Sequence, residues 1–398
     1  MNTSQKRYVI TYKNGNISAR DVSKILSIKD TTIHDAVTYL SSGKVIHEND
    51  IFHFHGLGSS SISLTDKEVE KLNNDAQIIA IEEDKQIVAA DLINQFETQT
   101  KPTISLLSPL KHESVRYADF SFSLTDKSIT WNIDLVKAPQ AWSKGITGKN
   151  IKVAVLDTGI ASHSDVIISG GVSFVSGSVA YQDGNGHGTH CAGIIAAGNN
   201  INGIKGVAPD ANLFAVKVLN DVGKGSLTSV LAGMAWAKDN NMDIVNMSLG
   251  GVATYSVAYQ NAVYLMLVAG VTVVCASGNC MGDAINSANS YGAIAVGAIN
   301  NKKMIADFSS MENLYNKASI VAPGVNVYST YLNNSYAILS GSSMATPHAA
   351  GAAALVKQKF PGISPAEILF KLRNTSTQSD DDNAIFGNGI INCDAATN

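Results

Sequence analysis

The sequence has no apolar run that approaches the roughly 20 residues of a membrane span. Its start, "MNTSQKRYVITYKNG", lacks the apolar core of a signal peptide, which leaves open whether the chain stays inside, leaves by another route, or once carried a leader. The net charge is only −4 over 398 residues, so no basic field points to nucleic acid or to an anionic membrane. We therefore expect neither a nucleic acid nor a membrane as a partner.

Cysteine is also scarce, and the four cysteines are Cys191, Cys275, Cys280 and Cys393. They are too few for a disulfide scaffold in a chain of this size. Cys275 and Cys393 stand in apolar contexts and are expected to behave as small buried hydrophobes, while a Cys275–Cys280 bridge stays open because spacing does not decide it. The 45% hydrophobic content is that of a globular protein, and 398 residues are enough for one large domain and a smaller one.

The first 90 residues alternate strand and helix signals. "RYVITYK" and "QIIAIEED" predict the first and last strands, "VIHENDIFHFHGLGSSSISL" two strands around a Gly/Ser turn, and "SARDVSKILSI" and "TDKEVEKLNN" two helices. This order predicts a small α+β domain over residues 1–90 with the split βαβ arrangement of ferredoxin-like folds. Residues 91–128 lack sustained periodicity, and we interpret them as a linker.

From residue 129 to residue 398 the pattern changes. The buried-strand runs "IKVAVLD", "NLFAVKVL", "DIVNMSL", "VTVVCAS" and "AIAVGAI" recur, with helix-length segments such as "SLTSVLAGMAWAKDN" and "YSVAYQNAVYLMLVAG" between several of them. Continuous apolar strands that alternate with helices predict an α/β domain, a doubly wound and mostly parallel sheet with helices on both faces. Sites in such sheets gather beyond the carboxyl ends of the strands.

Three motifs in this second region carry chemistry together. "VAVLDTG" places Asp157 at the end of a buried strand, "DGNGHGTHCAG" places His187 where a glycine-rich loop gives way to a helix, and "GSSMATPH" places Ser343 in the first turn of another helix. Each alone is as well explained by a turn aspartate, a loop histidine or a helix cap. Together they supply a hydroxyl nucleophile, an imidazole base and a carboxylate that fixes the base's tautomer.

A zinc site is the rival interpretation of the second motif. His187, His190 and Cys191 have a one-turn spacing that can put ligands on one helix face. No further carboxylate or cysteine nearby completes such a set, so we disfavour it.

"VLDTG", "GHGTHCAG", "NMSLGG" and "GSSMATPH" closely resemble the signature segments of the subtilisin-like serine proteases. The resemblance runs from "WNIDLVKAPQAW" to "FGNGIINCDAA", and the first 90 residues resemble the family's inhibitory propeptide. It implies that Ser343 is the nucleophile, His187 the general base and Asp157 its orienting acid. Asn279 in "ASGN" resembles the side-chain donor of the oxyanion hole, and Ser342 stands where the family more often has threonine.

The same resemblance implies the substrate contacts. "KGS" resembles an edge strand that pairs with extended peptide, and "SLGG" one wall of the first specificity pocket. The predicted substrate-binding residues are Lys224, Gly225, Ser226, Leu227, Ser248, Leu249, Gly250, Ala276, Ser277 and Gly278. Backbone pairing favours broad specificity, and Gly250 and Gly251 leave room for a large apolar or aromatic residue before the cut.

"AAGNNINGIKGVAP" resembles the family's loop around a structural calcium ion. The predicted Ca²⁺ donors are the side chains of Asp165 and Asn200 and the carbonyl groups of Gly198, Asn202 and Ile204. The alternative is an ordinary Asn/Gly surface loop, and the family's glutamine donor has no clear counterpart here.

The sequence thus predicts a serine endopeptidase made as a zymogen. Residues 1–90 would act as its own intramolecular inhibitor, with the tail near Lys85 to Ala90 laid across the cleft like a product strand. Cleavage is expected between Ala90 and Trp131, giving a monomeric, extracellular enzyme that acts on polypeptides. The rivals are a catalytically silent peptide-binding protein and a lipase or esterase, and the latter fails because the chain has no G-x-S-x-G elbow.

Overall fold

The computed structural model describes residues 5–27, 33–89, 129–198, 203–251, 255–279, 288, 290–310, 320–377 and 389–398. Ala90, the predicted linker 91–128, Asn200, Asn202 and Cys280 lie outside these residues. None of the described helices combines the length and the apolar character that a membrane crossing requires.

The N-terminal region forms a five-stranded sheet in the order β2-β3-β4-β1-β5. Its strands are β1 (Lys6–Tyr12), β2 (Ile33–Asp35), β3 (Ile51–Phe54), β4 (Ser59–Leu64) and β5 (Ile78–Glu83), and its helices are α1 (Ala19–Ile25), α2 (Ala36–Ser41) and α3 (Asp66–Leu72). β1 lies between β4 and β5 and is antiparallel to both, as the predicted split βαβ arrangement requires. β2 and α2 are additions that the sequence patterns did not predict.

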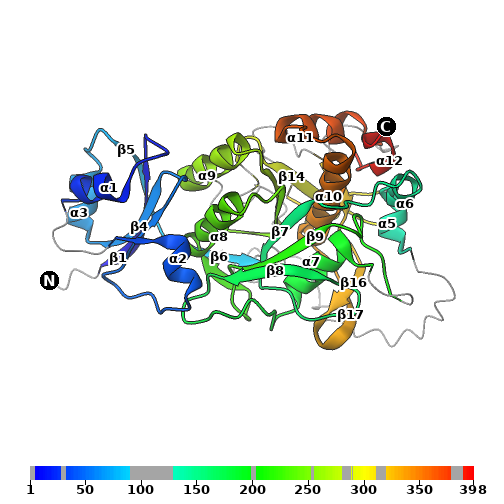
Figure 1. The fold of residues 1–398 in the computed structure, drawn as a ribbon, viewed down its shortest axis with the longest axis horizontal. Helices are drawn as coiled ribbons and strands as arrows, with labels where there is room; N and C mark the ends of the chain where they lie inside the picture. The colour runs from blue at the N-terminus through cyan, green and yellow to red at the C-terminus, as the bar shows by residue number, and fades with distance from the viewer. Residues whose placement is uncertain are drawn as a thin grey trace, which may run out of the picture.

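Both faces of the N-terminal sheet pack against helices. Because side chains alternate along a strand, neighbouring residues reach opposite faces of the sheet. On β1, Ile10 packs into the region's own core, which α1 and α3 cover. Val9, its neighbour, packs instead with residues of α8 (Leu227–Asp239) and α9 (Val257–Val268) of the C-terminal region. Figure 1 shows these two helices beside the blue N-terminal strands, so the two regions share one apolar interface.

The C-terminal region is built on a seven-stranded sheet in the order β15-β14-β13-β11-β7-β9-β8. These strands are β7 (Lys152–Asp157), β8 (Ile168–Ser173), β9 (Asn212–Lys217), β11 (Ile244–Met247), β13 (Thr272–Ala276), β14 (Ile294–Ile299) and β15 (Ile320–Pro323). Every neighbouring pair is parallel. The predicted parallel α/β sheet is confirmed.

Helices cover both faces of this sheet. α8 and α9 pack on one face, and α7 (His187–Ala196) and α10 (Ser342–Lys359) pack together on the other. A side chain at Gly351 of α10 would lie 2.6 Å from the Cβ of Val207, so the small residues of α10 allow its close approach. The remaining elements are α5 (Trp131–Leu135), α6 (Ala138–Trp142), the hairpin of β16 (Val327–Tyr331) and β17 (Ser335–Leu339) with the turn η2 (Leu332–Asn334), α11 (Pro365–Asn374) and α12 (Cys393–Ala396).

A third, small sheet joins the two regions. Its central strand is β6 (Gln86–Ala89), the end of the described N-terminal region, and it lies between β10 (Lys224–Ser226) and β12 (Leu249–Gly250). Both pairings are antiparallel. In Figure 1, β6 is the cyan strand that leaves the N-terminal sheet and enters the C-terminal region.

The cysteine predictions hold where the structure describes them. Cys275 and Cys393 are buried, as is Cys191. Burial raises the pKa of the Cys393 thiol, so this group remains neutral and acts as a small apolar side chain.

Candidate active site

Asp157 and His187 meet at the carboxyl end of β7. Asp157 is the last residue of β7, and His187 is the first residue of α7. The imidazole Nδ1 donates to Asp157 Oδ1 at 2.7 Å, and both side chains are buried. A Cβ at Gly188 would lie 2.1 Å from the carbonyl oxygen of Gly159, so only glycine lets the helix start come this close to the strand end.

Ser343 is the second residue of α10 and is tied to the segment before β12. The Ser343 hydroxyl donates to the carbonyl oxygen of Ser248 at 3.2 Å, and the Ser248 hydroxyl donates to the carbonyl oxygen of Ser343 at 2.9 Å. These reciprocal bonds fix the start of α10 to the end of β11 and the beginning of β12.

Ser342, the adjacent serine, has a different environment. Its hydroxyl accepts from the amide of Gly278 at 3.1 Å, and its own amide donates to Asn279 Oδ1 at 2.8 Å. Since an amide side chain carries its oxygen and its NH₂ on opposite sides, this bond turns the Asn279 NH₂ away from the Ser342 amide. Ser342 thus holds the loop after β13, and Asn279 presents a fixed donor.

The predicted substrate strands enclose β6. Val88 pairs with both Lys224 and Gly250, and Ala89 pairs with Leu249. The amide of Ala89 also donates to the carbonyl oxygen of Gly223 at 3.1 Å. Gly223 was not among the substrate-binding residues predicted from the sequence, although it directly precedes the "KGS" motif.

The other predicted substrate residues lie around this sheet. Leu227 is buried in the same apolar cluster as Ile87 of β6 and Leu249. Ala276, Ser277 and Gly278 are packed at the end of β13, where the Ser277 amide bonds to Val296 and the Gly278 amide to Ser342.

Of the three residues of the zinc interpretation, His187 and Cys191 lie together and His190 does not join them. Nε2 of His190 lies 3.1 Å from the carbonyl oxygens of both Val327 and Ala337, and burial lowers the pKa of His190 to about 3. Among the described residues, Asp157, His187 and Cys191 are the group whose ligand atoms lie together. His190 instead anchors the β16–β17 hairpin as a neutral ring.

Asp165 stands at the base of the predicted calcium loop. Its buried carboxylate oxygen Oδ2 accepts from the amide of Ile204 at 2.9 Å and from the hydroxyl of Tyr336 at 2.8 Å. Its carbonyl oxygen accepts from the amide of Gly198 at 2.9 Å. A Cβ at Gly203 would lie 2.1 Å from this carboxylate, so the loop backbone passes directly over it.

Two carboxylates of the N-terminal region meet helix starts of the C-terminal region. Asp84 accepts from the amide and the hydroxyl of Thr228, at 2.9 and 2.7 Å, at the start of α8. Glu82 accepts from the amide of Ala258 at 2.7 Å at the start of α9. The positive end of a helix dipole favours such carboxylates. Burial raises the pKa of Asp84, against the lowering effect of the Thr228 bonds.

Known proteins are similar to this chain over almost its whole length. Residues 148–389 match the model of the Subtilase family of peptidases. The chain belongs to the subtilase family. It is 50% identical over 273 residues to subtilisin BL of Lederbergia lenta, which covers 68% of this chain and 99% of that protein. It is 45% identical over 336 residues to an alkaline protease of Alkalihalobacillus alcalophilus, covering 82% of this chain and 86% of that protein.

The similarity of this subtilase to known proteases extends over its N-terminal region. A thermostable alkaline protease of Halalkalibacterium halodurans is 38% identical over 394 residues, covering 99% of this chain and 92% of that protein. The region before the peptidase domain is consistent with a propeptide. By family and identity the chain is a serine endopeptidase of the subtilisin type.

Proposed function

We propose that Ser343, His187 and Asp157 form the catalytic triad. The buried 2.7 Å bond between His187 and Asp157 carries the proposal, because it fixes the imidazole with Nδ1 protonated and leaves Nε2 as the base. The Ser343 hydroxyl passes its proton to His187 as its oxygen attacks the scissile carbonyl carbon. His187 then gives the proton to the leaving amine, and water releases the acyl group by the same proton path.

Asn279 and the Ser343 amide are the proposed oxyanion donors. The Ser342 amide holds the oxygen of the Asn279 side chain, so the NH₂ group keeps one orientation while charge develops on the substrate oxygen. In enzymes of this class one such donor stabilises the transition state by about 3–4 kcal/mol. Asn279→Ala is therefore expected to lower kcat by about 100-fold or more and to leave KM almost unchanged.

Activity measurements distinguish the endopeptidase from its two alternatives, an esterase and a catalytically silent peptide-binding protein. Hydrolysis of casein supports the endopeptidase. Turnover of a short-chain ester with no cleavage of casein would favour an esterase, and tight peptide binding with neither activity would favour the silent fold.

Residues 1–90 act in this proposal as the intramolecular inhibitor. β6 supports it, since the strand fills the position between β10 and β12 that an extended substrate would take. In a substrate that keeps this register, the residue that follows the partner of Leu249 would face Ser248, whose carbonyl group holds the Ser343 hydroxyl. We therefore place the first cut at Ala90–Asp91, with later trimming of the linker 91–128.

The mature chain must keep α5. The side-chain NH₂ of Asn132 donates to Nε2 of His348 on α10 at 2.9 Å, and His348 Nδ1 donates to the carbonyl oxygen of Met344. These bonds are buried, so trimming beyond Trp131 would expose the base of the helix that carries Ser343. The final cut therefore falls before Trp131.

The tail of β6 also bears on specificity. Ile87, Val88, Ala89 and Ala90 are all apolar, and the last two are small. We propose that the enzyme has broad specificity and accepts small apolar residues before the cut as well as large apolar or aromatic ones. It acts on polypeptides as an extracellular monomer.

Calcium is proposed as a structural ion held by the loop 198–204. Asp165 supports this, because a buried carboxylate under a closely passing backbone is a suitable oxygen donor for Ca²⁺. The carbonyl groups of Gly198, Asn202 and Ile204, together with the side chain of Asn200, would complete the site. The ion would brace the loop between α7 and β9, and it would take no part in peptide cleavage.

A further inference from the structure

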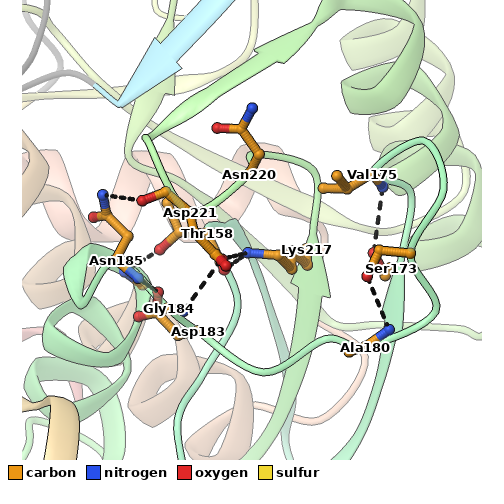
Figure 2. Close-up of polar contacts among 12 residues, drawn as sticks. Thr158, Ser173, Val175, Ala180, Asp183, Gly184, Asn185, Lys217, Asn220 and Asp221 are labelled. Atoms are coloured by element: carbon orange, nitrogen blue, oxygen red, sulfur yellow. Dashed lines mark hydrogen bonds and ion pairs between the residues drawn. The ribbon is translucent and has the colours of Figure 1, made fainter.

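Lys217, the last residue of β9, carries a buried ammonium group near the end of β7. Its side chain is 5% exposed, and it donates to the carbonyl oxygen of Thr158 and to Asp221 Oδ1, the latter at 2.7 Å. Figure 2 shows these three residues together, with the Asp221 carboxylate beside the end of the Lys217 side chain. Burying a lysine is costly unless it is paired and hydrogen-bonded, so the Lys217 ammonium depends on Thr158 and Asp221.

Thr158 connects the lysine to the triad. Its amide donates to Asp157 Oδ1 at 2.7 Å, the oxygen that also accepts from His187. Its hydroxyl accepts from the amide of Gly188 at 3.0 Å. A single residue held by Lys217 therefore contacts both the Asp157 carboxylate and the start of α7.

Asp221 connects the same lysine to the other side of His187. Its carboxylate accepts from the amide of Gly184 at 3.2 Å, and its carbonyl oxygen accepts from the side chain of Asn185 at 3.1 Å. Asn185 Oδ1 in turn accepts from the amide of His187 at 3.2 Å. The Lys217 ammonium holds the pKa of Asp221 below its usual range, so this carboxylate stays charged around neutral pH.

The pair also reaches the substrate strand. Asn220 and Asp221 open the tight turn that leads into β10, and Asn220 Oδ1 accepts from the amide of Lys224 at 3.0 Å. The carbonyl oxygen of Gly223, on this turn, accepts a hydrogen bond from the amide of Ala89. The turn that presents the substrate-binding edge is thus tied to Lys217 through Asp221.

We propose that Lys217 and Asp221 form a charged positioning pair that holds Asp157, His187 and the β10 edge in their reacting geometry. The proposal rests on the triad assignment made above. Neither residue touches the reacting atoms. Lys217 acts through Thr158, and Asp221 acts through Gly184 and Asn185.

The test compares Lys217→Met, Asp221→Asn and the double variant with the wild type. The variants are matured with a trace of tagged wild-type enzyme that is then removed, and active sites are titrated. Misplacing the triad is expected to lower kcat of Lys217→Met by about 10- to 100-fold, with KM changed less than about threefold. Lys144→Met, which breaks the 2.6 Å pair with Asp394 in the first turn of α12, is the control for loss of one charge and one ion pair. It should leave kcat unchanged.

The pH profile of kcat/KM separates positioning from mere stability. A cation disfavours imidazolium, so removing Lys217 raises the pKa of His187 and moves the acid limb to higher pH. Removing the Asp221 charge lowers the pKa of His187 and moves the acid limb to lower pH. Each shift is roughly a few tenths of a pH unit, and the acid limb of the double variant lies close to that of the wild type. The other titratable groups around His187, namely Asp157, Asp183, His190 and Cys191, are the same in all variants.

Two results would overturn the proposal. One is a lower melting temperature for Lys217→Met with kcat and the acid limb as in the wild type, which would make the pair a structural brace. The other is a shift of both single variants in the same direction. If Lys217→Met does not fold, the exposed Asp221→Asn still gives the second readout. Activity surviving in Ser343→Ala would instead overturn the triad, so the two failures are distinguishable.

Discussion

Ser248 and Ser343 exchange two hydrogen bonds, hydroxyl to carbonyl in each direction, at 2.9 and 3.2 Å. Leu249, the residue after Ser248, begins the strand that pairs with β6. The proposed nucleophile is therefore fixed directly to the edge that holds the substrate backbone. The position of Ser343 along a bound peptide follows from strand register alone, independently of the bound side chains.

The first prediction concerns the site of the first cut. The proposed first cut follows Ala90, so a refolding time course followed by mass spectrometry should give residues 1–90 as the first N-terminal fragment. Fragments that end in the linker should appear only later. A first fragment that ends at another residue would show that the register of β6 is not the register of cleavage.

The second prediction concerns the contact between the propeptide and α8. Asp84→Ala removes the two hydrogen bonds that Thr228 donates to a partly buried carboxylate, and bonds to a charged group contribute about 1.5–3 kcal/mol. The inhibition constant of added residues 1–90 against the mature enzyme should rise by about 10- to 100-fold.

Glu83→Ala is the matched control for Asp84→Ala. Glu83 pairs with Lys6 at 3.5 Å and both side chains are half exposed, so this change should alter the inhibition constant by less than about twofold. Equal effects of the two variants would mean that net charge, rather than the cap on α8, decides inhibition.

The strands show how much of the fold could be predicted. β7, β9, β11, β13 and β14 were visible because each is a continuous run of β-branched or apolar residues. β8, "ISGGVS", was missed because two glycines interrupt it, and its place comes only from pairing with β9. β15, "IVAP", was missed because it is only four residues long and ends in a proline. The β16–β17 hairpin was missed because its residues are mixed, and β17 is only partly buried.

A candidate site could be proposed from the sequence only where a motif stands at the end of one element. Asp157, His187 and Ser343 are of this kind. Asp84 was not, because its partner Thr228 is 144 residues away and nothing local marks the contact. Lys217 reads as the polar end of an apolar strand, and only the fold brings Thr158 to its ammonium group.

The third prediction concerns acid stability. Burial lowers the pKa of His348 to about 4, so between pH 6.5 and 4 the unfolded chain binds a proton that the folded chain does not. The free energy of unfolding should therefore fall as the pH falls through this window, by about 1.4 kcal/mol per pH unit for this histidine. Urea unfolding of the inactive Ser343→Ala protein should show the slope, and His348→Gln should reduce it. The same slope in both proteins would contradict the assignment.

The fourth prediction concerns calcium. An ion that binds only the folded chain stabilises it by about 2.7 kcal/mol at a hundredfold excess over the dissociation constant. Melting temperatures with calcium and with chelator should differ in the wild type and converge in Asn200→Ala and Asp165→Asn, with peptide turnover at low temperature nearly intact. Asp210→Asn, an exposed position after the loop, should keep the difference. Identical melting temperatures with and without calcium in the wild type would exclude the site.

The most direct test compares the two adjacent serines. Ser343→Ala should accumulate as one full-length, folded and inactive chain, which active wild-type enzyme then cuts in the linker. Ser342→Ala loses the bond to the Gly278 amide but keeps the nucleophile, so it should still mature and cleave peptides, only more slowly. The measurement is the fraction of each variant processed on its own, followed by its peptidase activity. If Ser343→Ala processes itself and cleaves peptides while Ser342→Ala does neither, the nucleophile is Ser342 and the triad proposed here is wrong.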